Sequence, residues 1–199
     1  MNVVVTSPSF SKNEILQNEM FKYFPKAILN FKGKRFNRDE LIQYIKNADA
    51  AIVGLEMIDK KVLDKCQNLK IIAKYGVGLN NIDLEACREK NVTIGWTGGV
   101  NKLSVAEMTL GFMLMSTRNL YFTSNQLKNG TWNKSGGFQL SGKNVGIIGL
   151  GYTGKEIVRL LKPFGCKILV NDIINQEKYY KENNLKETSK EQIFKISDI

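Results

Sequence analysis

An apolar run over residues 145–148 leads directly into three glycines with the spacing Gly-x-Gly-x-x-Gly, at Gly149, Gly151 and Gly154. Glycines at this spacing permit a tight turn, let backbone amides come close to a ligand, and allow the following helix to pack against the strand. The N-terminus of such a helix attracts anions. The pattern therefore predicts a βα unit of a parallel sheet, with a phosphate-bearing ligand held at the turn.

An acidic residue, Asp172, stands 18 residues after Gly154, at the end of the next apolar segment, 167–171. A carboxylate at this place can accept hydrogen bonds from the adenosine ribose and repels a 2′-phosphate, which favours NAD over NADP. The alternatives are an ordinary βα turn for the glycines and a helix-capping role for the aspartate. Because the strand, the glycines and the aspartate occur together, we expect a dinucleotide site. Its expected residues are Gly149, Gly151, Tyr152, Thr153, Gly154 and Asp172.

Short apolar runs alternate with amphipathic segments along the whole chain, as in the βα units of a parallel sheet. We expect strands at 3–7, 27–31, 50–55, 69–74, 92–96, 144–149 and 167–171. Helices are expected at 12–24, 37–47, 59–66, 83–90, 154–164, 179–183 and 189–196, with Asn37 and Asp83 as N-caps. The first five strands would complete a domain over residues 1–98, and the paired glycines at 98–99 predict a hinge. A second domain then covers residues 99–199.

One long helix is predicted from Ser104 to about Lys128. The segment Ser104-Val105-Ala106-Glu107 fits a capping box at its start. Apolar residues occupy most sides of its first half, so we expect that half to be buried, between domains or between subunits. These residues are Leu103, Val105, Met108, Leu110, Phe112, Met113, Leu114 and Met115, and the methionines among them are expected to fill a core.

The composition argues against several classes of protein. No segment approaches the roughly 20 apolar residues of a membrane span, so we expect no membrane association and a cytoplasmic protein. The three cysteines are far apart, which predicts reduced thiols and no metal site, and histidine, the commonest general base, is absent. The net charge of +10 is spread among acidic residues, with its densest cluster at residues 32–35, so a nucleic-acid site is not favoured.

A second glycine-rich turn, Tyr75-Gly76-Val77-Gly78, follows the apolar segment 69–74. Two glycines at the carboxyl end of a strand can direct successive backbone amides at an anion, although a plain turn is the alternative. Together with other motifs, this turn makes the chain resemble the D-2-hydroxyacid dehydrogenase family, to which phosphoglycerate dehydrogenase belongs. The matching segments are Tyr75–Asp83, Gly98–Thr109, and Leu140–Lys143 leading into Gly149–Gly154.

The resemblance implies an α/β protein with two domains. A flavodoxin-like parallel-sheet substrate domain would cover residues 1–98, and an incomplete Rossmann NAD-binding domain would cover residues 99–199. It also implies hydride transfer between NAD(H) and a 2-hydroxy or 2-oxo acid, and a homodimer formed through the long helix 104–128. The substrate would contact Tyr75, Gly76, Val77 and Gly78, and Thr109 would lie near the cofactor.

The family's catalytic arginine, glutamate and histidine would lie beyond Ile199, so the resemblance implies a C-terminally truncated chain that carries no catalytic residue and is inactive alone. Met108 stands where relatives often have histidine, Asn80 where aspartate is frequent, and Thr153 where an aliphatic residue is usual. These departures leave the substrate's identity open. The alternative function is a non-catalytic, NAD-sensing binding module of the kind found among the family's corepressors, and a nucleic-acid-associated basic protein is a weaker third hypothesis.

Overall fold

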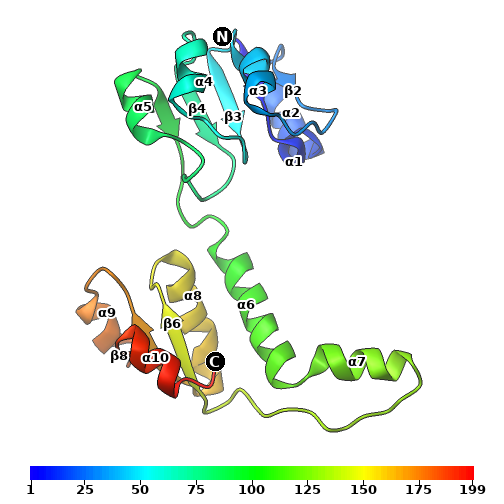
Figure 1. Ribbon diagram of the computed structural model, residues 1–199, viewed down its shortest axis with the longest axis vertical. Coiled ribbons are helices and arrows are strands. Elements are labelled where there is room, and N and C mark those ends of the chain that lie inside the picture. Colours follow the sequence, from blue (N-terminus) through cyan, green and yellow to red (C-terminus); the bar gives the residue numbers. More distant parts are fainter. The chain divides into compact units, whose positions relative to one another are not determined.

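The computed structural model describes residues 1–199 and divides the chain into two compact units, Met1–Gly98 and Gly99–Ile199 (Figure 1). Each unit has a parallel sheet and a buried core of its own. The α/β class predicted from the alternating pattern is confirmed. No helix has the length and apolar content needed to cross a membrane.

The sheet of the first unit has the strand order β2-β1-β3-β4-β5, with every pairing parallel. This is the doubly wound order of the flavodoxin-like fold, so that prediction is confirmed. The register places Val4 opposite Ala51, and Ala51 opposite Ile72. The strands are β1 (Val3–Val5), β2 (Ile28–Leu29), β3 (Ala50–Val53), β4 (Ile71–Lys74) and β5 (Thr93–Gly95).

Five helices connect these strands: α1 (Pro8–Ser11), α2 (Glu14–Tyr23), α3 (Arg38–Ile45), α4 (Lys60–Lys65) and α5 (Leu84–Glu89). The predicted helix 12–24 is found as α2, which begins after Asn13 because the Asn13 side chain accepts the amide of Leu16 at 3.1 Å, and the short helix α1 before it was not predicted. The predicted caps Asn37 and Asp83 accept the amides three residues further on, at 3.0 and 2.9 Å. Short polar side chains thus fix where these helices begin.

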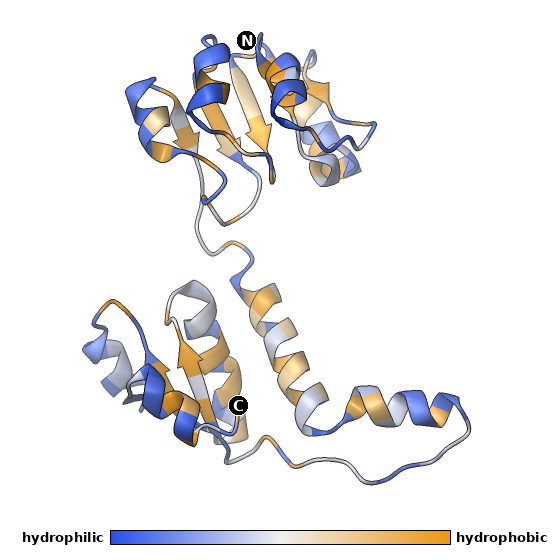
Figure 2. Cartoon of the chain, in the orientation of Figure 1, coloured by the Kyte–Doolittle hydropathy of each residue, from blue (hydrophilic) through white to orange (hydrophobic).

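Both faces of the first sheet are buried, because successive residues of a strand point to opposite faces. Val4, Ala51 and Ile72 belong to one core cluster, which also contains residues of α3, α4 and α5. Val3 and Val5 belong to another, which contains Phe10 of α1 and Met20 of α2. This double burial explains why the strands are apolar without alternation, as Figure 2 shows.

The second unit has the sheet order β6-β7-β8, all parallel, which is the order of the first half of a Rossmann domain. On the other side of β6, Asp198 donates its amide to Asn144 O and Gly146 donates to Ile199 O, both at 2.9 Å. The elements are β6 (Asn144–Ile148), α8 (Tyr152–Leu161), the 3-10 helix η1 (Lys162–Phe164), β7 (Lys167–Asn171), α9 (Glu177–Glu182), β8 (Lys186–Glu187) and α10 (Lys190–Ile196). Strand β8 was not predicted, because its two residues are charged and exposed.

The prediction of one long helix over residues 104–128 is wrong. Two helices occupy this region, α6 (Lys102–Thr117) and α7 (Leu120–Lys128). They are separated at Asn119, whose φ of 51° is left-handed. Asparagine adopts this conformation more readily than most residues, so the chain can turn between the end of α6 and the start of α7.

The predicted capping box is also wrong. Helix α6 begins at Lys102, so Ser104 and Glu107 lie inside its first turns, and its N-cap, Asn101, makes no side-chain hydrogen bond. Burial of the first half on most sides is likewise not observed within the chain, because α6 packs with one face on α8 and leaves Met108 and Phe112 60% and 59% exposed. The apolar surface is present, but the single chain covers only part of it.

Candidate functional site

The predicted glycine turn connects β6 to α8 and has one closed and one open side. Gly149 has a φ of 96°, which side chains rarely tolerate. A Cβ atom on Gly154 would lie 2.2 Å from the carbonyl oxygen of Gly149, so only glycine lets α8 approach the end of the strand this closely. A Cβ on Gly149 or Gly151 would meet nothing within 4 Å. The open side is therefore where a ligand can reach the backbone.

The first turn of α8 presents backbone amides without a side-chain cap. Gly151 is the N-cap in an extended conformation, and no side chain accepts a hydrogen bond from the amides that follow. Unpaired amides and the helix dipole make such a terminus suited to a phosphate. Tyr152 and Thr153, both predicted cofactor residues, are the first two residues of this helix, and Tyr152 is exposed.

Asp172 follows β7 and is bonded to the glycine turn. Its carboxylate accepts the amide of Ile174 at 2.9 Å and also the amide of Leu150, which lies between two of the glycines. Gln176 Nε2 donates to Leu150 O at 3.1 Å, which adds a further bond between the glycine turn and the segment after β7. The amides of Ile174 and Leu150 lower the pKa of the Asp172 carboxyl group, so it is ionised at neutral pH. The structure thus brings the predicted aspartate and the predicted glycines together.

Thr109 is the remaining predicted cofactor residue. It lies on α6, the helix that packs against α8, and its hydroxyl donates to Val105 O at 2.8 Å. This bond occupies the hydroxyl within its own helix. The only hydrogen bond of the Thr109 side chain is to Val105 O, so its role toward the cofactor stays a prediction.

The Tyr75–Gly78 turn follows β4 in the first unit and is fixed at several points. The amide of Tyr75 donates to Val53 O at 2.9 Å, and the Tyr75 ring meets the ring of Phe10 edge-on at 5.3 Å. Trp96 Nε1 donates to Val77 O at 2.8 Å. Gly76 has a φ of 139°. The four predicted substrate residues therefore form one ordered turn at the carboxyl end of a strand.

Sequence reasoning missed a polar group beside this turn, formed by Thr6, Glu56, Lys74 and Asn81. Lys74 directly precedes the turn, and Asn81 follows it closely. A lysine at the end of an apolar strand was the available signal. Most of the group could not be predicted, because Thr6, Gly54 and Glu56 follow the ends of other strands.

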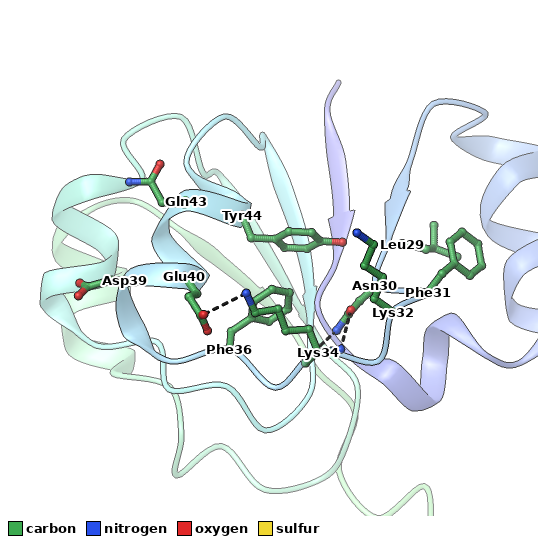
Figure 3. Close-up of a pocket in the computed structure, with 10 residues that line it drawn as sticks. All are labelled: Leu29, Asn30, Phe31, Lys32, Lys34, Phe36, Asp39, Glu40, Gln43 and Tyr44. Carbon is green, nitrogen blue, oxygen red and sulfur yellow. Dashed lines mark hydrogen bonds and ion pairs between the residues drawn. The ribbon is translucent and has the colours of Figure 1, made fainter.

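A pocket of about 700 Å³ lies in the first unit, beside β2 and α3 (Figure 3). Its lining residues are Leu29, Asn30, Phe31, Lys32, Lys34, Phe36, Asp39, Glu40, Gln43 and Tyr44, none of which was predicted as a site residue. Several of its polar groups are already paired: Lys34 with Glu40 at 3.0 Å, and Asn30 Nδ2 with Thr6 O at 2.7 Å. Phe36 and Tyr44 stack at 4.6 Å and form an apolar wall.

Comparisons with known proteins agree with this geometry. A family model described as "D-isomer specific 2-hydroxyacid dehydrogenase, catalytic domain" matches residues 3–196. The chain is 38% identical over 138 residues to D-3-phosphoglycerate dehydrogenase of Methanocaldococcus jannaschii, covering 68% of this chain and 26% of that protein. It is 35% identical over 150 residues to hydroxypyruvate reductase of Thermotoga maritima, covering 74% of this chain and 49% of that protein.

Among solved structures, NAD⁺-bound 3-phosphoglycerate dehydrogenase of Entamoeba histolytica aligns with a TM-score of 0.76 and 27% identity, over 99% of this chain and 60% of that chain. The chain thus spans less than two thirds of the length of each of these three proteins. The family match nevertheless includes both units and the turns described above. The chain belongs to the D-isomer specific 2-hydroxyacid dehydrogenases, a family of oxidoreductases that use NAD(H).

Proposed function

We propose that this chain forms the substrate domain and part of the NAD-binding domain of an NAD-dependent 2-hydroxyacid dehydrogenase. Such an enzyme transfers a hydride between NAD(H) and a 2-hydroxy or 2-oxo acid. The observation that carries the proposal is the bond between the ionised Asp172 and the amide of Leu150, inside the glycine turn that begins α8. It supports a dinucleotide site because a phosphate-binding terminus and a ribose-binding carboxylate adjoin each other.

In this proposal the start of α8 and Asp172 bind different parts of NAD. The amides at the start of α8 bind the pyrophosphate, next to Gly151, Tyr152 and Thr153. Asp172 accepts hydrogen bonds from the adenosine ribose, and its negative charge disfavours the 2′-phosphate of NADP. The bound nicotinamide supplies or accepts the hydride. The open space beside Gly149 supports this arrangement, since no other atom of the chain fills it.

The proposed substrate site is the Tyr75–Gly78 turn, whose backbone amides would bind the substrate carboxylate. The positive φ of Gly76 and the hydrogen bond from Trp96 to Val77 support a turn with one stable conformation. The names of two relatives, D-3-phosphoglycerate dehydrogenase and hydroxypyruvate reductase, refer to small 2-hydroxy and 2-oxo acids. We propose a substrate of that class.

The 199-residue chain is expected to bind NAD but not to catalyse the reaction at an ordinary rate. The substrate hydroxyl must exchange a proton, and the sequence has no histidine. The thiols do not replace it, since burial raises the pKa of all three cysteines, that of Cys66 to about 11. General acid–base catalysis contributes about 10²- to 10⁴-fold, so the rate should fall at least about 100-fold below that of a complete relative.

The test combines calorimetric titration of the chain with NAD and NADP and an assay with NADH and pyruvate, glyoxylate or hydroxypyruvate. Thermotoga maritima hydroxypyruvate reductase serves as the reference for the rate. The variant Asp172→Asn should weaken NAD binding and reduce the preference over NADP. Absence of NAD binding would refute the cofactor site, whereas an ordinary rate of NADH oxidation would refute the predicted inactivity.

The proposal includes a cytoplasmic location and a homodimer formed through α6 and α7. Exposed aromatic side chains on and beside these helices support the dimer: Phe112, Tyr121 and Trp132 are 59%, 73% and 75% exposed. Patches of this kind mark protein interfaces.

Sedimentation of the chain should show the mass of a dimer, and the variant Phe112→Lys should show the mass of a monomer. The matched control is Phe194→Lys, at an exposed phenylalanine of α10. A monomer at every concentration would contradict the proposal.

A further inference from the structure

We propose that Lys74 is a positioning residue for the carboxylate-binding turn, supplying the positive charge that attracts the substrate to the amides of Tyr75–Gly78. The inference rests on the proposed function of that turn and adds to it a cation that none of the predicted site residues provides.

The ammonium group of Lys74 connects two loops at the carboxyl end of the sheet. Its Nζ donates to Gly54 O, just after β3, and to Asn81 Oδ1 at 2.7 Å, just after the glycine-rich turn. Asn81 is buried, and its Nδ2 donates to Glu56 O at 2.7 Å and to Gly54 O at 3.3 Å. These bonds hold the lysine side chain in one place, so its charge has a defined position.

The carboxylate of Glu56 lies near Lys74 but is bonded to other groups. Glu56 Oε2 accepts from Thr6 Oγ1 at 2.6 Å and from the amide of Gly54 at 2.9 Å. Lys74 takes part in none of the seven ion pairs of the chain. Burial lowers the pKa of the Lys74 ammonium group, and Glu56 acts against this change. The lysine charge is therefore near a carboxylate but not neutralised by direct contact.

Lys74 also lies next to the glycine-rich turn. A Cβ atom built on Gly76 would lie 3.4 Å from Lys74 Cε and 3.9 Å from Nζ. An ammonium group has three N–H donors, and only two of those of Lys74 have a partner in the chain. A fixed, unpaired positive charge with a free donor thus adjoins the amides that are proposed to bind a carboxylate.

The test uses the whole chain labelled with ¹⁵N and titrated with oxalate, a stable dicarboxylate, while the amide signals of Val77 and Gly78 are followed by NMR. Lys74→Met should weaken oxalate binding about tenfold, as expected for losing one charge near a partly exposed site. Lys74→Arg should restore most of the affinity. The control is Lys70→Met, at an exposed lysine next to the same strand, and it should bind like the wild type.

Added salt separates a charge effect from a structural one, because salt screens a charge but leaves a steric contact unchanged. Oxalate affinity should fall with salt more steeply in the wild type than in Lys74→Met. If the methionine variant misfolds, Lys74→Gln replaces it, since glutamine keeps a donor for Gly54 O without the charge. Equal affinity and equal salt dependence in the wild type and the neutral variant would overturn the role of Lys74. If oxalate leaves Val77 and Gly78 unaffected in the wild type, the proposed substrate site itself is refuted.

Discussion

Replacing Gly154 with valine is expected to destabilise the second unit by about 3 kcal/mol, the upper end of the usual cost of overpacking. The added Cβ would lie 2.2 Å from the carbonyl oxygen of Gly149. This oxygen belongs to the backbone, so it cannot rotate away, and α8 must move off the end of β6. Because α8 carries the buried Val158 and Leu161, that movement disrupts the core of the unit.

Hydrogen exchange across β6 and β7 measures this effect, since protection there depends on the packing of α8 against the sheet. Gly111→Ala is the matched control, because a Cβ on this glycine of α6 meets nothing within 4 Å. Alanine inside a helix should stabilise by about 0.5–1 kcal/mol relative to glycine. Equal protection in Gly154→Val and the wild type would show that the close approach of helix and strand is not needed.

Replacing Ile72 with alanine is expected to cost the first unit about 2–5 kcal/mol, the usual range for a fully buried isoleucine. Ile72 lies on β4, between β3 and β5, and is 0% exposed. Its loss leaves a cavity among residues that belong to both the sheet and the covering helices. Because a domain of this size is stable by only several kcal/mol, most of the unit's stability would be lost.

Ile71→Ala is the matched control, since the adjacent Ile71 is 39% exposed and should cost about 1 kcal/mol or less. Urea unfolding can be followed by the fluorescence of Trp96, which is in the first unit, after Trp132→Phe removes the other tryptophan. The midpoint should fall much further for Ile72→Ala than for Ile71→Ala. Similar midpoints would contradict the assignment of Ile72 to the core.

The sequence predicted the strands and the helix starts, because these depend on interactions between residues that are close in the chain. The seven predicted strands all exist, because apolar runs bounded by turn residues have few other ways to bury themselves. Asn37 and Asp83 cap helices through bonds that span only three residues. The prediction failed over residues 104–128, where helix-forming sequence on both sides of Arg118 and Asn119 concealed a two-residue break.

The candidate site likewise has one part that the sequence predicted and one part that it did not. The glycines and Asp172 follow a spacing typical of one βαβ unit, here β6, α8 and β7, so the sequence alone placed them together. Lys74 bonds to Gly54 O across 20 positions, and Glu56 bonds to Thr6 across 50 positions. These partners meet only when parallel strands assemble in the order β1-β3-β4. Strand order comes from tertiary packing, which no short motif records.

The bond from Leu150 to Asp172 has a consequence for the energetics of ligand binding. The carboxylate and the glycine turn are ordered against each other by folding itself, through Leu150, Ile174 and Gln176. A ligand that uses both parts therefore meets a preorganised surface and loses little affinity to ordering the loop. Substitutions at Gln176, which donates to the Leu150 carbonyl and to Asp172 at 3.4 Å, should accordingly affect affinity through the free protein rather than through the complex.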